Sequence, residues 1–468
     1  MLQFNGPARQ THCDGIPRRS FLLAGALGFG GLSMADLFRA EAAAGITGSH
    51  RAIINIHLDG GPPQMDMIDM KPQAPREVRG EFDSMATSIP GFRVNELMPR
   101  TAKAARELTF LRSLVGAENR HDAFQCQSGF GAKDLQSIGG RPAMGCIINH
   151  LTDGETSAPA FVDMMQGRPL VRNSARPGFL GPAYQPFRPD ISQMFSRPLE
   201  EAMKGELAAL GAGHTTALKL HASINASRLQ DRDSLLHQLD RVRRQVDQSG
   251  MMNAMDRFHQ QAAGILTSGE LAKALDLENE DPKVVENFIA ESTGVNRSST
   301  SEDERSMLKL LIARRLIQAG VRCVSVSLSD FDTHSGNFKR LRHLLPVFDH
   351  GLNALIDDLR EQNMLDDVLI VAWGEFGRTP KINGNAGRDH WPRVAMGMMA
   401  GGGLRHGQVI GATDAWAAEV TSRPVHYQDV MATLYQHLGI DARTTTVMDP
   451  TGRPQYLLDR GEPISELT

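Results

Sequence analysis

Acidic and imidazole side chains follow three apolar runs of the sequence, each at the point where the run ends. The runs span Ala52–Ile56, Val321–Leu328 and Val368–Trp373. The residues after them that could bind a cation are Asp59, Asp332, His334, Glu375, Asp389 and His390. Mixed carboxylate and imidazole ligation is typical of zinc, manganese or iron, whereas magnesium and calcium prefer oxygen alone. The pattern therefore predicts a transition-metal site.

A single strand that ends in a polar residue carries little information, because such a turn often does no more than satisfy backbone groups. Three strands that each end in such residues together favour a metal site. Asp332 and His334 are two residues apart, so an extended segment places them on the same side, where one cation could take both. Gly60 and Gly61 would let backbone and cation approach Asp59 closely. Two such ions about 4 Å apart would activate water and stabilise the leaving oxygen of a phosphate or sulfate ester.

Two arginines and one further histidine are the other candidates for chemistry. Arg378 and Arg388 could grip a tetrahedral oxyanion in bidentate fashion, and the alternative for each is a surface or interdomain salt bridge. His121 could be a ligand, a general acid or base, or a residue at the entry of a helix. The histidines that we expect to be structural are His57, His343, His350, His406, His426 and His437.

The elements that would position these residues alternate between strands and helices. The expected strands are Ala52–Leu58, Leu108–Leu114, Ala160–Met164, Val321–Leu328, Val368–Trp373 and Val394–Ala400. The expected helices are about Asn95–Arg106, Ser306–Ala319, Phe338–Arg360 and His426–Leu438. This alternation is typical of an α/β fold with a mainly parallel sheet covered by helices. Ligands of such folds bind at the carboxyl ends of the strands, where the candidate residues lie.

Composition divides the chain into four segments. We expect a targeting segment at 1–44, the first part of the α/β core at 45–190, a helical insertion or cap at 191–305, and the rest of the core at 306–468. Helical spacing of apolar residues amid many charges indicates the insertion, and those charges are most simply a solvated face. A proline-rich connection at 169–189 marks the boundary before it.

The N-terminus has the pattern of an export signal. Arg18 and Arg19 precede an apolar stretch that ends at Leu32, and small residues at 40–44 offer cleavage sites. The twin arginine indicates the Tat export machinery. An uncleaved membrane anchor is the alternative, but the stretch is short and rich in glycine. We therefore expect a periplasmic or secreted protein with no stable membrane span after cleavage.

Cysteine content and charge narrow the possible partners. Cys126, Cys146 and Cys323 remain after cleavage, too few for a disulfide framework, which suits a protein that folds and takes up its metal before export. The formal net charge is -4, from 50 basic and 54 acidic residues. Because no positive excess would attract nucleic acid, we expect no nucleic-acid partner.

Several motifs resemble those of the DUF1501 family, and the resemblance spans nearly the whole mature chain. The segments that carry it are Leu58–Pro62, Asp66 with Asp69–Pro72, Arg112–Ser113 with His121, Gly178–Tyr184, Phe331–His334, Gly374–Pro380 and Gly387–Pro392. That family is similar to the alkaline phosphatase and sulfatase superfamily, and its members are typically exported bacterial proteins. The resemblance implies a three-layer α/β/α core like that of alkaline phosphatase, with a two-metal centre.

The resemblance also implies roles for the candidate ligands in chain order. Asp59 resembles the bridging ligand after the first strand, and Asp332 and His334 resemble the central ligands. Glu375 resembles the acid at the next strand exit, and His390 resembles the final histidine. The order of residue types agrees with a two-metal hydrolase.

The chain departs from that superfamily at the expected nucleophile. A Ser, a Thr or a Cys that becomes formylglycine is expected at the head of the helix after the second strand, but the segment Asn119–Gly129 begins Asn-Arg-His. Cys126 also lacks the Cys-x-Pro-Ser-Arg context of ordinary sulfatases. Either His121 acts as nucleophile or ligand, or Ser113 lies closer than its position suggests, or a metal-bound hydroxide attacks directly. Direct attack is the simplest of these.

These observations favour an exported hydrolase of phosphate or sulfate esters with two divalent ions, zinc or manganese. Its substrate would be a small-molecule or glycan ester. The rival is a non-catalytic protein that uses a degenerate metal site to hold a sulfated or phosphorylated glycan at the cell surface. A third reading, a metal-dependent mutase or transferase, would need a covalent intermediate.

Overall fold

The computed structural model describes residues 51–468 except 153–157, 190, 192–268 and 293–301. The expected targeting segment lies outside the described residues, and so does most of the expected helical insertion. Two short α-helices in the range expected for that insertion are described, α13 (Glu270–Leu275) and α14 (Pro282–Asn287). Leu271 and Ala274 of α13 belong to the same hydrophobic core as the helix at Leu308–Gln318.

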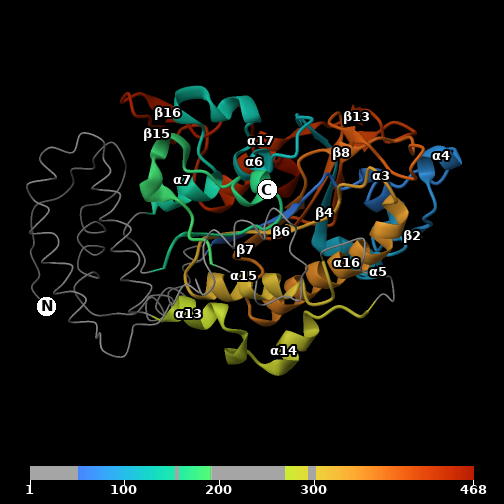
Figure 1. The fold of residues 1–468 in the computed structure, drawn as a ribbon, viewed down its shortest axis with the longest axis horizontal. Coiled ribbons are helices and arrows are strands. Elements are labelled where there is room, and N and C mark those ends of the chain that lie inside the picture. Colours follow the sequence, from blue (N-terminus) through green and yellow to red (C-terminus); the bar gives the residue numbers. More distant parts are fainter. Residues whose placement is uncertain (1–50, 153–157, 190, 192–268, 293–301) are drawn as a thin grey trace, which may run out of the picture. The chain divides into compact units, whose positions relative to one another are not determined.

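An eight-stranded mixed sheet forms the middle layer of the described fold (Figure 1). Its strands are β1 (Ala52–Leu58), β4 (Leu108–Val115), β5 (Phe161–Met164), β6 (Cys323–Leu328), β7 (Val368–Trp373), β10 (Ala395–Gly401), β11 (Gln408–Ile410) and β14 (Val425–His426). Their order is β11-β4-β10-β7-β1-β6-β5, with β14 beside β4. Within this sheet β10 runs antiparallel to both of its neighbours, and the other pairs are parallel. The expected α/β class with a mainly parallel sheet is confirmed.

The strands that carry the candidate residues end level with one another. Leu58 at the end of β1 lies opposite Leu328 at the end of β6, and His57 lies opposite Trp373 at the end of β7. Just beyond the strands, the backbone nitrogen of Asp59 donates to the carbonyl of Leu328 at 2.8 Å. The segments that follow β1, β6 and β7 therefore emerge at one edge of the sheet.

Helices cover both faces of the sheet and complete the expected three layers (Figure 1). The helices on one face are α5 (Pro99–Ala104), α15 (Leu308–Gln318) and α16 (Asn337–Glu361), and those on the other are α6 (Phe124–Ser128), α7 (Met144–Leu151) and α17 (Tyr427–His437). Successive residues of a strand point to opposite faces. Accordingly, Ile54 and Ile56 of β1 share a core with the first set of helices, and Ile53 shares a core with the second.

The local sequence explains where two of these helices begin. Pro99 is the first residue of α5, a position that suits its fixed φ and missing N–H. The helix α17 is capped by His426, whose Nδ1 accepts from the backbone of Gln428 at 3.1 Å. Asp429 in turn accepts from the backbone of His426 at 2.7 Å, which completes a reciprocal cap. His426 is therefore structural, as expected.

The expected helix at about Asn95–Arg106 is shorter than predicted. The chain before it forms a hairpin in which β2 (Ser84–Ala86) pairs with β3 (Arg93–Asn95), and α5 begins only at Pro99. Proline further inside a helix would remove a hydrogen bond and clash with the preceding turn. The sequence also does not reveal β11 and β14, because two or three residues carry no periodic signal.

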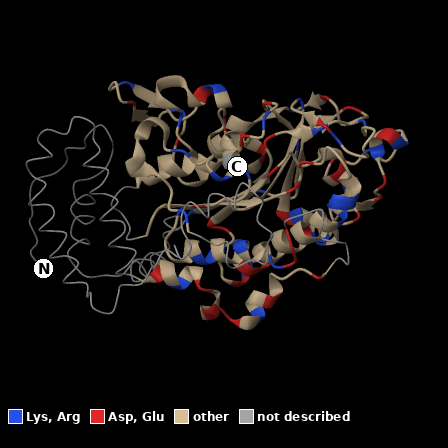
Figure 2. Ribbon diagram, viewed as in Figure 1, with Lys and Arg blue, Asp and Glu red and all other residues tan. Residues whose placement is uncertain are grey.

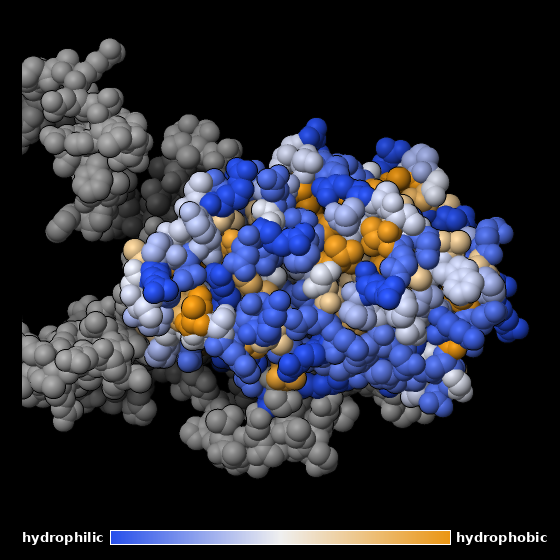
Figure 3. Space-filling view, turned by 90° about the horizontal axis from the view of Figure 1, so that it is seen from above, coloured by the Kyte–Doolittle hydropathy of each residue, from blue (hydrophilic) through white to orange (hydrophobic). Residues whose placement is uncertain are grey.

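Short elements connect the layers. The remaining helices and strands are α3 (Gln64–Met67), α4 (Arg76–Arg79), α8 (Pro169–Arg172), β8 (Gly377–Arg378), β9 (His390–Trp391), β12 (Ala412–Thr413), β13 (Val420–Ser422), β15 (Thr446–Met448) and β16 (Pro454–Tyr456). Basic and acidic residues are interspersed over the described elements (Figure 2). The face drawn in Figure 3 is mostly hydrophilic, with small separate apolar patches. Among the described helices, none has the length and apolar character needed to cross a membrane.

Candidate metal centre

Seven side chains at this edge of the sheet form two groups whose ligand atoms could hold metal ions. The inner group contains His57, Asp59 and Glu375, and the outer group contains His121, Asp332, His334 and His390. Within each group the ligand atoms lie within 4.8 Å of one another. The structure thus brings together the expected ligands except Asp389, and it adds His57.

The inner group is buried. His57 lies on β1, Asp59 follows β1 and Glu375 follows β7, and their exposed fractions are 0%, 4% and 1%. Oε1 of Glu375 accepts from the backbone of Gly60 at 3.0 Å, and Oε2 lies 3.4 Å from Nε2 of His57. His57 and Asp59 are two residues apart, so an extended chain directs both side chains to the same side.

Three polar atoms of the inner group have no hydrogen-bond partner among the described residues. They are Nδ1 and Nε2 of His57 and Oδ1 of Asp59. Burial, followed by the charge of Glu375, raises the pKa of Asp59 to about 8, and burial lowers the pKa of His57. Buried polar atoms are normally paired because an unpaired one costs free energy. A cation is a partner that would satisfy Oδ1 of Asp59 and one nitrogen of His57.

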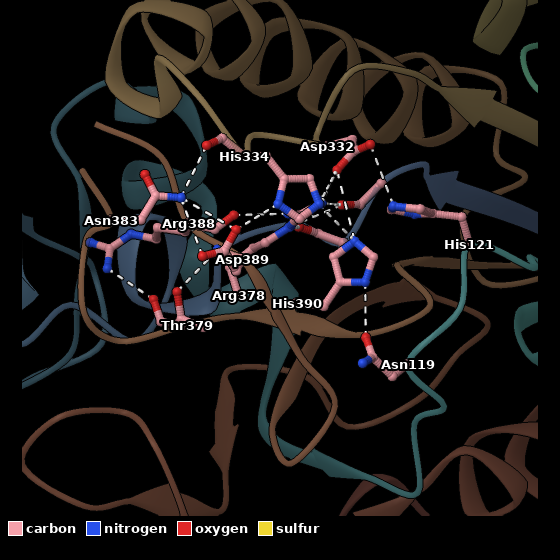
Figure 4. A network of polar contacts seen from close by, with 12 residues as sticks. Asn119, His121, Asp332, His334, Arg378, Thr379, Asn383, Arg388, Asp389 and His390 are labelled. Atoms are coloured by element: carbon pink, nitrogen blue, oxygen red, sulfur yellow. Dashed lines mark hydrogen bonds and ion pairs between the residues drawn. The ribbon is translucent and has the colours of Figure 1, made fainter. Parts of the chain in front are cut away.

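The outer group is partly exposed to solvent, chiefly at His334. The side chain of His334 is 48% exposed, whereas those of Asp332 and His390 are 19% and 20% exposed. Nε2 of His334 lies 3.0 Å from Nε2 of His390 and 3.3 Å from Oδ1 of Asp332 (Figure 4). These three atoms are ligands of the kind that zinc takes.

Two further residues orient the histidines of the outer group. Nδ1 of His334 lies 2.6 Å from Oδ1 of Asp389, and Nδ1 of His390 lies 2.8 Å from Oδ1 of Asn119 (Figure 4). If both Nδ1 atoms donate, both Nε2 atoms present a lone pair to the group. Burial, followed by the charge of His121, lowers the pKa of His390 to about 4, so this ring is neutral at pH 7. Asp389 was expected to be a metal ligand. It instead contacts Nδ1 of His334, the ring nitrogen that does not face the other ligand atoms.

His121 joins the two groups. Its Nδ1 lies 2.9 Å from Oε1 of Glu375, and its Nε2 lies 3.4 Å from Oδ2 of Asp332. Burial acts to lower the pKa of His121, but hydrogen bonds to Asp332 and Glu375 outweigh it and raise the pKa to about 9. The ring also packs against those of His390 and Phe376, at centroid distances of 4.4 Å and 5.1 Å. A positive charge on His121 therefore lies between the two carboxylates.

Asp332 lies between two arginines. Its Oδ1 accepts from Nη2 of Arg378 at 2.7 Å, and its Oδ2 accepts from Nη2 of Arg168 at 2.5 Å. Burial would raise the pKa of Asp332, but hydrogen bonds from His121, Arg378 and Arg168 hold it well below its ordinary value. Arg378 is fully buried and also donates to the carbonyl of Gly60. Arg168 is 36% exposed, so it is the guanidinium that faces solvent.

Arg388 is committed to structural contacts. It is fully buried, and its Nε and Nη2 pair with the two carboxylate oxygens of Asp66, each at 2.7 Å. Its other donors bind the carbonyls of Val78, Thr379 and Pro380. Because all five guanidinium donors are used within the protein, the structure does not support the substrate contact expected of Arg388.

Residues 50–468 match the sequence pattern of DUF1501, which is described as a protein of unknown function. The chain belongs to the DUF1501 family. The family expected from the motifs is thereby confirmed. Among curated protein sequences, none matches the chain.

Several solved structures are distantly similar to this DUF1501 chain. A sulfatase from Pseudoalteromonas sp. is 11% identical over 87% of this chain and 71% of that one, with a TM-score of 0.38. The phosphonate monoester hydrolase of Agrobacterium radiobacter is 11% identical over 89% and 77%, with a TM-score of 0.34. The phosphonate monoester hydrolase from Silicibacter pomeroyi is 12% identical over 83% and 72%, with a TM-score of 0.30.

Two residues of the DUF1501 site were not expected from the sequence, although each carries a signal. His57 stands two residues before Asp59 at the end of an apolar strand, which is the spacing that pairs Asp332 with His334. Arg168 follows the apolar strand β5, as the other candidates follow β1, β6 and β7. Both residues could therefore have been predicted from their positions at or after the ends of apolar strands.

The hydroxyl and thiol groups considered as nucleophiles have other surroundings. Ser113 on β4 is buried and donates to the carbonyl of Arg423 at 2.6 Å. Cys126 in α6 belongs to neither ligand group, and burial raises the pKa of its thiol well above the ordinary value. The structure therefore gives no support to the alternative that relies on Ser113.

The other histidines expected to be structural contact the backbone. His343, His350, His406 and His437 each lie within hydrogen-bond distance of at least one main-chain carbonyl. Their environment agrees with a structural role, so His57 is the exception in that set.

Proposed function

We propose that this DUF1501 chain is an exported, metal-dependent hydrolase of phosphate or sulfate esters. The observation that carries the proposal is the pair of adjoining ligand groups, one buried and one partly exposed to solvent. A buried carboxylate oxygen and a buried imidazole that lack hydrogen-bond partners among the residues that the structure describes are the kind of site that a bound cation stabilises. The solvent-facing group beside it offers a substrate access to the same centre.

Each group would hold one divalent ion. His57, Asp59 and Glu375 would hold the inner ion, and Asp332, His334 and His390 would hold the outer one. Zinc or manganese suits this mixture of nitrogen and oxygen ligands. When bound, such ions would supply Lewis-acid polarisation of an ester oxygen and activation of a water molecule.

The protein's own residues prepare the ligands. Asp389 and Asn119 accept from the Nδ1 atoms of His334 and His390 and fix the ring orientations. His121 holds a proton between Glu375 and Asp332, where it can respond to changes of charge at the centre. We assign it the role of acid or base at the junction of the groups, because its nitrogens reach both carboxylates.

We assign to Arg168 the oxyanion-binding role that the sequence led us to expect of Arg378 and Arg388. The guanidinium of Arg168 is partly exposed. Burial acts to lower its pKa, but the hydrogen bond to Asp332 and the charges of Asp59, Asp332 and Glu375 outweigh burial and raise the pKa above the ordinary value. A cation bound to Asp332 would share that carboxylate with Arg168. The guanidinium N–H groups of Arg168 that do not bind Asp332 would then be available to the substrate. A planar guanidinium matches two oxygens of a phosphate or sulfate group. Arg378, fully buried, instead positions Asp332.

The decisive experiment measures metal content and turnover on the same preparation of the full-length protein. We expect two zinc or manganese ions per chain by elemental analysis. We also expect the metal-loaded protein to hydrolyse an aryl phosphate, a phosphodiester or an aryl sulfate, with loss of activity on chelation. A preparation that binds no transition metal stoichiometrically would contradict the proposal.

Substitution of Arg168 tests the assigned oxyanion contact. Removing one charge-assisted contact corresponds to a loss of about 1.5–3 kcal/mol, so Arg168→Ala should lower kcat/KM by roughly 10- to 100-fold. The bound metal should remain. Arg360→Ala is the control, since Arg360 is an exposed arginine whose partners, Glu107 and Asp357, lie outside both ligand groups. Unchanged kcat/KM in Arg168→Ala would remove the residue from the mechanism.

The second candidate is a non-catalytic binding protein for sulfated or phosphorylated glycans. The structural contexts of Ser113 and Cys126 favour it, because neither group is placed to act as a covalent nucleophile. Stoichiometric metal and glycan binding without turnover of any ester, and with binding intact in His121→Ala, would support this function. Turnover would exclude it.

We propose Tat-dependent export on the basis of the twin arginine. Replacing both Arg18 and Arg19 with lysine should leave the protein in the cytoplasm, because the signal is read through these two residues. Cell fractionation followed by immunoblotting measures the distribution. Unchanged export of the double variant would point to another route.

A further inference from the structure

A cavity of about 580 Å³ lies among the segment after α3, helix α4 and the β2–β3 hairpin. Figure 1 shows α4 and β2 at the same end of the described fold. Among the residues that line the cavity are Met70, Lys71, Arg79, Phe82, Asp83 and Arg93. None of them belongs to the two ligand groups.

The rim of this cavity carries an excess of positive charge. Arg79, Arg93 and Lys71 line it together with one acid, Asp83. Arg79 and Arg93 are exposed, and within the described part of the chain neither makes an ion pair. Nε of Arg93 donates to the hydroxyl of Ser84 at 2.8 Å and Nη2 donates to the carbonyl of Ser84, which leaves Nη1 without a described partner. Two guanidinium groups with unused donors therefore border the same space.

Lys71 adds a third, partly compensated charge. Its Nζ lies 3.0 Å from Oδ1 of the buried Asp69, and Nη1 of Arg112 lies 3.4 Å from the same oxygen. One carboxylate thus serves two cations, so the charge of Lys71 at the cavity is only partly compensated. Anions would be attracted to this region of the surface.

The cavity also has an apolar wall. Phe82 is 4% exposed and packs edge-on against Phe338 of α16, with ring centroids 5.4 Å apart. Met70 and Pro72 supply further apolar surface. An apolar wall and a rim of guanidinium groups fit a saccharide ring that bears an anionic ester, because the ring packs on carbon and the ester oxygens accept from arginine.

One buried arginine, Arg388, contacts residues around the cavity and directly precedes a residue of the metal centre. The guanidinium carbon of Arg388 lies 5.8 Å from the Phe338 ring that supports Phe82. Arg388 also donates to the carbonyl of Val78 in α4 at 2.8 Å, and it directly precedes Asp389 in the chain. Arg388 therefore links the elements that border the cavity with the segment that carries Asp389.

We propose that this cavity binds a sulfate- or phosphate-bearing sugar unit of an extended anionic glycan. The inference extends the proposed function, since it assigns the substrate to the class of glycans with several anionic esters. Arg79 and Arg93 hold one ester group while another reaches the metal centre. A small monoester would leave the cavity empty.

Isothermal titration of the full-length protein with a heparin-derived oligosaccharide tests the site without requiring turnover. Losing two charge-assisted contacts should weaken binding by at least about tenfold in the double variant Arg79→Ala with Arg93→Ala. Arg76→Ala is the matched control, because Arg76 is exposed on the same helix but does not line the cavity. The parent protein should bind the desulfated oligosaccharide weakly. That affinity should be no higher than the affinity of the double variant for the sulfated oligosaccharide.

Further variants and ligands distinguish sulfate from phosphate esters and control for misfolding. Arg79→Ala alone leaves the contact of Arg93 with the hairpin intact, and Asp83→Asn should strengthen binding by removing the one acid. A phosphorylated mannan fragment tested beside the sulfated probe shows which ester is preferred. Equal affinity in the parent, double-variant and control proteins overturns the proposal. If binding follows this pattern but the protein hydrolyses no ester, the result supports the glycan site in the cavity and refutes the proposed hydrolase function instead.

Discussion

Arg388 and Arg168 each pair with a carboxylate, but in different surroundings. Both partners of the Arg388–Asp66 pair are fully buried, whereas Arg168 is 36% exposed. Breaking a buried pair by removing one partner costs about 3–5 kcal/mol, and an exposed pair contributes about 1 kcal/mol or less. We therefore expect Arg388→Ala to lower the free energy of unfolding far more than Arg168→Ala.

Urea denaturation of the two variants measures the difference. Arg388→Lys keeps the charge but not the five-donor fork, so it should recover only part of the stability lost in Arg388→Ala. Equal losses in Arg388→Ala and Arg168→Ala would contradict the structural role of Arg388. They would also reopen its assignment as a residue that contacts substrate.

Asp59 makes the stability of the metal-free protein depend on pH. Its pKa is raised to about 8, above its ordinary value of 3.8, so the folded state holds the proton more tightly than the unfolded state. The resulting stabilisation is complete below pH 3.8 and is lost as pH rises through 8. Asp59→Asn removes this titration, and above pH 8 the metal-free variant should be more stable than the parent by roughly 1–3 kcal/mol.

Thermal unfolding in chelator across this pH range tests the prediction. Asp59→Asn should also lose the stabilisation by added zinc that the parent gains at pH 8, because a neutral amide replaces a ligand carboxylate. Curves for the two proteins that stay parallel from acid to alkaline pH would show that Asp59 is already charged without metal.

The residues that support the site lie far along the chain from the residues that they contact. The candidate ligands were predictable from the sequence because each follows an apolar strand, and the ends of such strands can be recognised in the sequence. Their supporting partners were not, since Asn119 lies 271 positions from His390 and Asp66 lies 322 from Arg388. Whether an arginine meets a substrate or a buried aspartate is decided by tertiary packing, which no local pattern records.

Among the elements, the exit of β1 depends on a close backbone approach at Gly60. Its φ is +108°, and a Cβ there would lie 2.2 Å from the backbone nitrogen of Asp332. An alanine would both strain the turn and push apart the segments that follow β1 and β6. Gly60→Ala should cost about 1–3 kcal/mol of stability and weaken metal binding, because it separates Asp59 from the outer group.

Gly384→Ala is the matched control for this prediction. Gly384 lies in the connection between β8 and β9, and a Cβ there would meet nothing within 4 Å. Calorimetry and a metal titration of both variants provide the comparison. Metal affinity that is retained in Gly60→Ala would show that the two strand exits need not touch for the centre to form.

The predicted elements agree best with the structure where burial alone determines them. The apolar runs of β1, β6 and β7 are buried on both faces, as strands of a covered parallel sheet must be. The direction of β10 could not be inferred, because apolar spacing is the same in a strand that runs either way. The start of α5 at Pro99 was missed for a different reason, since the preceding hairpin has apolar residues that also fit a helix.

For the whole molecule, metal binding and folding are expected to be coupled. The inner group lies at the end of β1, between β6 and β7 in the middle of the sheet, and its unpaired atoms are buried. A ligand present at 100 times its Kd stabilises the folded state by about 2.7 kcal/mol. Removing metal should therefore lower the Tm, and zinc or manganese should restore it better than magnesium, which prefers an all-oxygen shell.

The difference in burial between the groups predicts that the two ions can be removed separately. His57→Ala should abolish the slowly exchanging ion of the inner group, whereas His334→Ala should abolish the readily exchanged ion of the half-exposed outer group. Each variant should retain about one ion per chain by elemental analysis, and the inner-group variant should lose more of the metal-dependent Tm increase. Loss of both ions in both variants would instead show that His121, which contacts Glu375 and Asp332, couples the groups into a single cooperative site.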